Sequence, residues 1–249
     1  MAFGDGESPA VHEVEKALAP YAFNCRTKNK GMVVNKLNLN LGCGDTAPDG
    51  WVNCDSSWNA QLSKLTFAHR AIKRMGLVSE ARWPVNVRYL SLAKRFPWKD
   101  GSVDVVYASH VFEHLDQRVA DNFMRESMRI LKRGGVLRIV VPDLLFHAKR
   151  YVHSTIDGAS GAEEFLAITN LRLPVARSLI HNTYNLILGH PSLHKQMYDW
   201  ATLRKTVESY GFVSIKQMSH GVSESIANIL DVEGHGAGYE GSLYLEALK

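Results

Sequence analysis

Leucine alternates with asparagine over residues 37–41 (LNLNL), and the tripeptide Gly-Cys-Gly follows directly at residues 42–44. A period of two places successive side chains on opposite faces of a β-strand, so the alternation predicts a buried strand. Glycine straight after a strand is typical of a place where another group approaches the main chain closely. The stretch therefore predicts a strand that leads into either a tight turn or a ligand-binding loop.

The rest of the chain alternates between strand-like and helix-like segments. Further strands are expected at residues 51–55, 87–92, 103–108, 136–141, 212–218 and 242–248, and helices at residues 59–75, from 116 to the glycines at 134–135, and at 200–210. Such alternation indicates a mainly parallel sheet covered on both faces, and two consecutive strands at the end indicate an antiparallel edge. The predicted fold is α/β, a doubly wound and mainly parallel sheet of seven strands.

The sequence predicts one domain with two additions. Residues 1–36 contain Ser8-Pro9, a helix cap followed by a first-turn proline, and then an apolar stripe, which predicts a short N-terminal helix that acts as a lid. Residues 37–249 are expected to form the main domain. Within it, residues 144–194 have a mostly helical pattern interrupted by glycine and proline, which predicts a helical insertion over one edge of the sheet.

Composition narrows the class of protein. The 249 residues are 45% hydrophobic and 22% charged, which is usual for a globular domain. Cys25, Cys43 and Cys54 are odd in number and lack Cys-x-x-Cys spacing, so neither a disulfide framework nor a cysteine metal site is indicated. No apolar run approaches the roughly 18 residues that span a bilayer. We expect a soluble, cytoplasmic protein. The net charge is +4, and the basic residues form scattered clusters that allow an anionic substrate. No basic run interleaved with aromatic residues indicates a nucleic-acid partner.

Asp55 gives the predicted ligand loop a chemical identity. In a doubly wound sheet the ligand lies beyond the carboxyl ends of the strands, where an acid can accept two hydrogen bonds from a ribose diol. The alternative is a strand-end acid with only a structural role. A dinucleotide site would require a third glycine and an acid about 20 residues further on. Here position 46 is Thr and Asp55 follows Gly44 by 11 residues, which fits a nucleoside without a pyrophosphate.

Four motifs together resemble the class I S-adenosylmethionine-dependent methyltransferases, whose Rossmann-like fold is the one expected above. LNLGCG resembles the first motif, WVNCD the ribose-binding acid, FPWKDGSVDVVYASHVFEHL the fourth strand and its loop, and RILKRGGVLRIVVPD the following helix and fifth strand. HKQMYDWATLRKTVESYGF with SLYLEALK is also similar to a bacterial subgroup often thought to modify sugars or surface glycans. The resemblance spans residues 37–249 without much of 144–185.

The resemblance implies S-adenosylmethionine as the cofactor. The residues that it places around this cofactor are Asn40, Gly42, Cys43, Gly44, Asp55, Leu92 and His110. The Gly-Cys-Gly segment would pass under the methionine part, and Asp55 would hold the ribose hydroxyls. Asn40 stands where the family usually has an acid for the methionine amino group. Ser91 stands where it often has an acid for adenine, so the Leu92 main chain is the expected adenine contact, and His110 would lie beside the sulfonium.

The segment His110-Val-Phe-Glu113-His114 has a competing interpretation. H-x-x-E-H is the inverted zinc-protease motif, in which two histidines bind the metal from one long helix. Here the motif follows a strand directly, so this interpretation is disfavoured and no metal is expected. Under the resemblance, Glu113 and His114 lie at a helix entrance that faces the substrate. A hydrogen-bonded structural histidine is the alternative for His114.

Histidine is the residue type that suits the expected chemistry. Methyl transfer to a hydroxyl requires an aligned acceptor and a base with a pKa near neutrality. His194 and His114 are the two candidates, without a preference. If residues 194–198 are helical, Tyr198 shares one face with His194 at i, i+4, and the two residues either line a pocket or pack in the interior. Asp143, directly after the fifth strand, is either a substrate residue or a helix cap.

The predicted function is therefore methylation of a small-molecule or carbohydrate-like acceptor, at oxygen. The acceptor pocket is expected to come from residues 144–185 and the N-terminal helix. The alternatives are a cofactor- or partner-binding module of the same fold without catalysis, an RNA methyltransferase, and a nicotinamide oxidoreductase. The absent third glycine opposes the last of these.

Overall fold

The computed structural model describes residues 36–57, 84, 86–156, 161–169, 193–236 and 240–249. The chain divides into two units, residues 1–35 and residues 36–249, and all described residues belong to the second. The predicted N-terminal helix and the helix predicted at residues 59–75 lie outside the described residues. Residues 170–192 of the predicted insertion also lie outside them.

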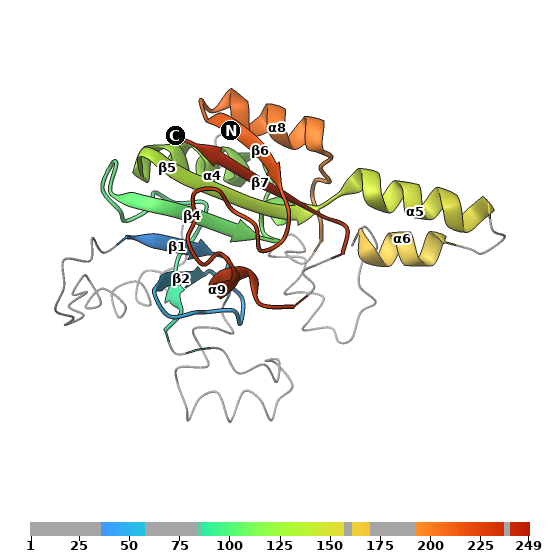
Figure 1. The fold of residues 1–249 in the computed structure, drawn as a ribbon, viewed down its shortest axis with the longest axis horizontal. Coiled ribbons are helices and arrows are strands. Elements are labelled where there is room, and N and C mark those ends of the chain that lie inside the picture. Colours follow the sequence, from blue (N-terminus) through green and yellow to red (C-terminus); the bar gives the residue numbers. More distant parts are fainter. Residues whose placement is uncertain (1–35, 58–83, 85, 157–160, 170–192, 237–239) are drawn as a thin grey trace, which may run out of the picture. The chain divides into compact units, whose positions relative to one another are not determined.

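Seven strands form a single sheet in the order β3-β2-β1-β4-β5-β7-β6 (Figure 1). The strands are β1 (Asn38–Leu41), β2 (Trp51–Asp55), β3 (Arg88–Tyr89), β4 (Val103–Ser109), β5 (Leu131–Pro142), β6 (Val213–Met218) and β7 (Ser242–Leu248). β1 to β5 pair in parallel, and β7 is antiparallel to both β5 and β6. The predicted mainly parallel sheet with an antiparallel C-terminal edge is confirmed.

The strand order reverses direction next to β1. The chain moves outward from β1 through β2 to β3 and then returns to the other side of β1 as β4. Asn40 is in register with Asn53 of β2 and Tyr107 of β4, so the carboxyl ends of these three strands lie side by side. This reversal is where doubly wound sheets bind their ligands.

Helices and short turns connect the strands. They are η2 (Phe112–His114), α4 (Gln117–Ile130), α5 (Leu144–Ile156), α6 (Ala162–Ile168), α8 (Trp200–Ser209) and α9 (Leu230–Glu233). Asp116 caps α4 by accepting a hydrogen bond from the Val119 amide, and Asp199 caps α8 in a reciprocal capping box with Thr202. The capping residues of α4 and α8 therefore fix where these two helices begin.

Three predicted boundaries need correction. The helix expected to reach Gly134 ends at Ile130, and β5 begins at Leu131, because the two glycines lie in an irregular part of the strand and not at a helix end. The strand expected at residues 87–92 is only Arg88–Tyr89. Residues 193–199 are not helical, and Tyr198 instead forms an isolated parallel bridge with Asp143.

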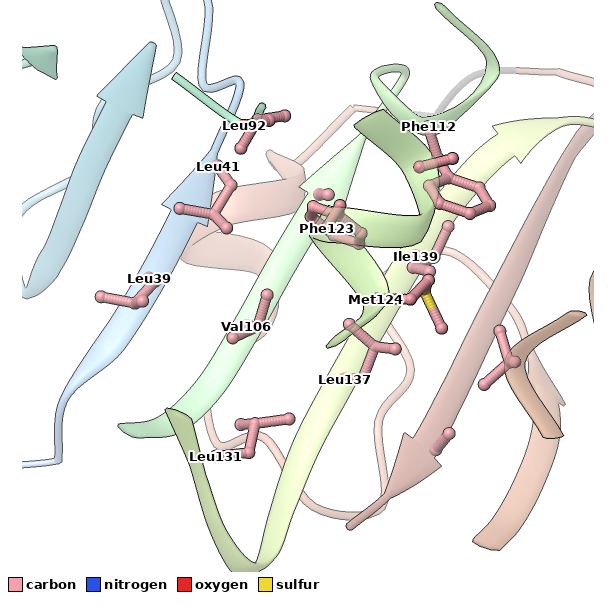
Figure 2. Packing of buried hydrophobic residues seen from close by; sticks show 14 of the residues in the cluster. Leu39, Leu41, Leu92, Val106, Phe112, Phe123, Met124, Leu131, Leu137 and Ile139 are labelled. Atoms are coloured by element: carbon pink, nitrogen blue, oxygen red, sulfur yellow. The ribbon is translucent and has the colours of Figure 1, made fainter. Parts of the chain in front are cut away.

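The period-two pattern of β1 places its leucines in the main hydrophobic core. Leu39 and Leu41 are fully buried on the face that α4 covers with Phe123 and Met124 (Figure 2). Asn40, between the two leucines, is also buried, because the opposite face of β1 is covered too. A second cluster contains β4 and β5 residues together with Ile226, Ile229 and Val232, and Figure 1 shows α9 beside the sheet. The main core thus packs on the face of β1 that carries Leu39 and Leu41, and the second cluster packs around β4 and β5.

Candidate active site

The loop after β1 turns through two glycines with different surroundings. Gly42 and Gly44 have left-handed φ values of 72° and 56°, a conformation that favours glycine. The amides of Gly42 and Cys43 both donate to the Cys54 carbonyl of β2, at 2.8 and 3.0 Å. A Cβ on Gly42 would clash with Cγ2 of Val111, whereas a Cβ on Gly44 would meet nothing within 4 Å. The tight-turn interpretation explains Gly42, and the open approach for a ligand lies at Gly44.

Asp55 connects this loop to the end of β2. Its Oδ2 accepts a hydrogen bond from the Gly44 amide at 3.0 Å, and its Oδ1 accepts one from the Ser57 amide at 2.7 Å. The residue is half-buried, and each carboxylate oxygen can accept more than one hydrogen bond. Asp55 is thus held in place by the loops and keeps acceptor capacity for the hydroxyls of a ribose, so the residues present fit a nucleoside.

Two buried asparagines hold the short link between β1 and β2. Asn40 Nδ2 donates to the Thr46 carbonyl at 2.9 Å and to Asn53 Oδ1 at 3.2 Å. Asn53 Nδ2 in turn donates to the carbonyls of Pro48 and Trp51, at 3.0 and 3.3 Å. These side chains satisfy main-chain carbonyls in a link that contains no helix. The Asn40 amide nitrogen is used within the loop, and a contact of Oδ1 with an amino group stays a prediction.

Two other predicted cofactor residues have clear structural surroundings. Burial raises the pKa of the Cys43 thiol to about 12, with Asp55 adding to the effect, so the thiol is neutral and not a nucleophile near pH 7. Leu92 is buried, and its carbonyl accepts a hydrogen bond from Asn122 of α4 at 2.7 Å. The Leu92 main chain is thereby fixed against α4, and its contact with adenine stays a prediction.

The loop after β4 carries His110 in an unusual backbone conformation. Its φ is 52°, in the left-handed region that non-glycine residues seldom adopt and that is concentrated at functional sites. The His110 amide donates to the Val140 carbonyl at 2.9 Å. Its ring Nδ1 lies 3.3 Å from Glu113 Oε1, and Nε2 lies 3.2 Å from Ser242 Oγ. The ring is therefore positioned by neighbours on both sides.

Glu113 is the centre of a histidine cluster. Its side chain is 0% exposed, and Oε1 lies 3.9 Å from Nε2 of both His114 and His194. Neither carboxylate oxygen accepts a hydrogen bond from any residue within the described ranges. The two candidate bases, 80 positions apart in the sequence, are thus brought together around one buried acid. We call Glu113, His114 and His194 the Glu113 cluster.

The two rings of the Glu113 cluster differ in their environment. His114 Nδ1 lies 3.1 Å from the Leu193 carbonyl, which can only accept, so Nδ1 carries the proton and Nε2 keeps its lone pair. His194 is 8% exposed, against 25% for His114, and burial lowers its pKa despite the opposing effect of the Glu113 carboxylate. The rings meet edge to face with centroids 4.7 Å apart. His194 is therefore the more deeply buried of the two rings, and its burial favours the neutral form.

The two predicted substrate residues lie close to each other. Asp143 Oδ1 accepts from the Leu145 amide at 2.9 Å, so Asp143 stands at the beginning of α5 as a helix-start acid. Tyr198 is 2% exposed, stacks on Phe112 with ring centroids 5.4 Å apart, and accepts the Leu144 amide through its carbonyl at 2.8 Å. Both residues have a structural task in joining η2 to α5, and a contact with substrate stays a prediction.

Sequence reasoning missed the central role of Glu113. The H-x-x-E-H spacing drew attention to the segment, and the structure places it in the short turn η2 and not in a long helix. The zinc-protease interpretation is thereby excluded. The third member of the cluster could not be found from local spacing, because His194 comes from a distant segment.

Comparison with known proteins identifies a methyltransferase domain within the chain. Residues 39–139 match a family model described as a methyltransferase domain. Among solved structures, the chain is similar to a possible histamine N-methyltransferase from Thermotoga maritima (15% identity, 88% of this chain and 84% of that chain covered, TM-score 0.44). It is also similar to an S-adenosylmethionine-dependent methyltransferase from Archaeoglobus fulgidus (16% identity, 98% and 95% covered, TM-score 0.43).

In the described part of the chain, no helix has the length and apolar character needed to cross a membrane. The family match covers the segments that build the Gly-Cys-Gly loop, Asp55 and the loop after β4. These segments lie at the strand-order reversal where a nucleoside ligand is expected. Residues 39–139 thus match a methyltransferase domain, and S-adenosylmethionine is the cofactor that this match supports.

Proposed function

We propose that the chain transfers the methyl group of S-adenosylmethionine to a hydroxyl oxygen of a small-molecule or carbohydrate-like acceptor. The observation that carries this proposal is the position of the Glu113 cluster. We call the Gly-Cys-Gly segment at residues 42–44 the cofactor loop. Val111 lies against Gly42 of this loop, and Glu113 follows Val111 by two residues on the loop after β4. Imidazole groups therefore lie beside the cofactor loop, where the acceptor must be deprotonated.

The chain's own residues account for cofactor binding in this proposal. Gly44 leaves the main chain open, Asp55 accepts hydrogen bonds from the ribose hydroxyls, and Asn40 Oδ1 accepts one from the methionine amino group. S-adenosylmethionine supplies an electrophilic methyl group on a positively charged sulfur. Because this carbon is already activated, the protein has to align the acceptor, exclude water and remove one proton.

The Glu113 cluster provides the base that takes that proton. As the acceptor oxygen bonds to the methyl carbon, the carbon–sulfur bond breaks, its electron pair stays on sulfur, and the hydroxyl proton moves to an imidazole nitrogen. His114 offers a lone pair at Nε2 and is the more exposed ring, whereas His194 is the ring with the lowered pKa. The buried Glu113 carboxylate would stabilise the imidazolium that forms on either ring.

Calorimetry with S-adenosylhomocysteine tests cofactor binding. Asp55→Ala should weaken binding by about 1.5–3 kcal/mol, because it removes a charged hydrogen-bond acceptor. Asp45→Ala, which changes an exposed acid on the same loop, is the matched control and should bind like the wild type. An absence of binding by the wild-type chain would refute the enzyme and favour a module of the same fold without catalysis.

A methyl-transfer assay tests the acceptor and the base. Sugars and small molecules that carry hydroxyl groups are incubated with S-adenosylmethionine labelled in its methyl group, and the products are identified by mass spectrometry. His114→Ala and His194→Ala should lower turnover, with the base contributing about 100- to 10,000-fold, while S-adenosylhomocysteine affinity is unchanged. Transfer to nitrogen only, or full turnover in both variants, would overturn the proposal.

A further inference from the structure

The Glu113 cluster has the composition of a metal site. One carboxylate oxygen and two imidazole nitrogens, from Glu113, His114 and His194, lie within 4.8 Å of one another. Two histidines and one carboxylate are the donor set of many zinc and iron(II) sites in proteins. Three protein ligands also leave coordination positions open for a substrate.

The Glu113 carboxylate is short of partners in its present surroundings. Its side chain is 0% exposed, and both oxygens are without a hydrogen bond from the residues that the structure describes. A buried carboxylate is costly unless it is paired and hydrogen-bonded. A ring nitrogen of His110 lies 3.3 Å from Oε1, and the Nε2 atoms of the two cluster rings lie 3.9 Å from it. A bound cation would compensate this buried charge.

His114 is held in the tautomer that a metal requires. Its Nδ1 proton points to the Leu193 carbonyl at 3.1 Å, which leaves the lone pair of Nε2 directed to the cluster. Metal-ligating histidines almost always donate their other ring proton to a carbonyl or a carboxylate in this way. Nε2 and Glu113 Oε1, both lone-pair donors, lie 3.9 Å apart.

His194 completes the set from a distant part of the sequence. Its Nε2 also lies 3.9 Å from Glu113 Oε1, and the ring is 8% exposed. Two ligand atoms about 2 Å from one tetrahedral ion lie about 3.3 Å apart. The separations of 3.9 Å to Glu113 Oε1, and of up to 4.8 Å within the cluster, would therefore have to shorten by side-chain rotation when the ion binds.

We propose that Glu113, His114 and His194 bind one divalent ion of the first transition series, such as Zn²⁺, Mn²⁺ or Fe²⁺. The proposal deepens the proposed function and relies on it for one consequence only. With the ion bound, a hydroxyl beside it would have a lowered pKa and release its proton to water, and the two histidines would act as ligands. In the metal-free chain they act as the bases of the proposed function. The metal proposal also revises the expectation of a metal-free site. That expectation came from local spacing, which does not include His194.

Metal titration of the full-length, untagged chain tests this site. The protein is stripped with a chelator and titrated with Co²⁺, whose visible absorption reports ligand number and type, and Zn²⁺ is then added as a competitor. We expect one equivalent of Co²⁺ to bind and to be displaced by Zn²⁺. Glu113→Gln, His114→Ala and His194→Ala should each weaken binding by at least about 100-fold, because even partners outside the ligand set contribute 10- to 100-fold.

His220→Gln is the matched control. His220 is another half-buried histidine whose ring contacts a main-chain carbonyl, that of Glu233 at 3.2 Å, and its replacement should leave Co²⁺ affinity unchanged. Wild-type protein that takes up no stoichiometric Co²⁺ or Zn²⁺, or cluster variants that bind like the wild type, would overturn the proposal. If Glu113→Gln does not fold by circular dichroism, the two histidine variants decide.

The titration contains no cofactor, so it separates the two proposals. A chain that binds Co²⁺ through the cluster but shows neither S-adenosylhomocysteine binding nor methyl transfer would support the metal site and contradict the proposed function. A chain that binds S-adenosylhomocysteine and methylates a hydroxyl after complete removal of metal, with no Co²⁺ binding, would overturn the metal site alone.

Discussion

Cγ2 of Val111 occupies the space that a Cβ atom on Gly42 would need. The loop after β4 is thereby packed directly on the loop after β1, and this contact joins the cofactor loop to the Glu113 cluster. Gly42 also has a φ of 72°, so two independent reasons require glycine there. At Gly44 only the φ of 56° requires it, because a Cβ would point into open space.

Gly42→Ala should therefore destabilise the chain more than Gly44→Ala. The left-handed conformation costs a non-glycine residue about 1–2 kcal/mol, and overpacking against Val111 adds about 1–3 kcal/mol at Gly42 alone. Urea unfolding measures both variants. Combining Gly42→Ala with Val111→Ala should recover the overpacking part as a favourable coupling energy. Equal destabilisation by the two glycine variants would show that the Val111 contact does not decide the residue type.

Much of this region could be predicted from the sequence because its signals are local. The alternation of leucine and asparagine gave β1 and the face it buries, and Asp55 was correctly placed at the end of β2. Asn40 shows the limit of such reasoning. Its proposed cofactor contact was inferred from its place in the family motif. In the structure its amide nitrogen donates to the Thr46 carbonyl and to Asn53 Oδ1, and these hydrogen bonds depend on the course of the loop.

Long-range contacts explain what the sequence did not show. The i, i+4 spacing of His194 and Tyr198 predicted one helical face, but the helix begins at its cap Asp199, and Tyr198 lies beside Asp143 instead. The Glu113 cluster likewise depends on a segment far away in the sequence that returns to η2, where the amide of Lys195 donates to the Glu113 carbonyl at 2.7 Å. No local period records such a contact.

Cys43 and Cys54 should resist alkylation in the native protein. Burial raises the pKa of each thiol to about 12, so the reactive thiolate is scarce at pH 8. In a Cys25→Ser background, iodoacetamide should modify both at least about 1,000-fold more slowly than free cysteine, as followed by mass spectrometry. Both should react at ordinary rates in urea. Rapid modification of native Cys43 would contradict a buried neutral thiol in the cofactor loop.

Arg138 should contribute strongly to stability through a buried ion-pair network. Its side chain is 0% exposed, and Nε and Nη2 donate to Glu233 Oε1 at 2.9 and 2.7 Å, with Glu246 Oε2 3.8 Å from Nη1. Arg138→Ala would leave two buried carboxylates without their cation, a change that costs about 3–5 kcal/mol. Arg125→Ala, which removes a largely exposed pair with Asp121, should cost less than about 1 kcal/mol in the same urea titration. Similar losses in the two variants would refute the network's role.

The pH dependence of stability should reveal the pair between Glu126 and Arg129 on α4. The Arg129 guanidinium, 2.6 Å from Glu126 Oε2, holds the pKa of that carboxyl below its ordinary value of 4.5, and the Phe96 amide assists at 2.7 Å. A carboxyl with a lowered folded-state pKa stabilises the fold fully above its unfolded pKa, and this contribution is lost as the pH falls through the folded value. Glu126→Gln should therefore lower the free energy of unfolding by about 1.5–3 kcal/mol at pH 7, and the difference from wild type should shrink below about pH 4.5.

Glu208→Gln is the control, because Glu208 is an exposed acid on α8. It should change the free energy of unfolding by less than about 0.5 kcal/mol at both pH 7 and pH 3. A difference for Glu126→Gln that stays constant from pH 7 to pH 3 would mean that packing, and not the charge of Glu126, is responsible.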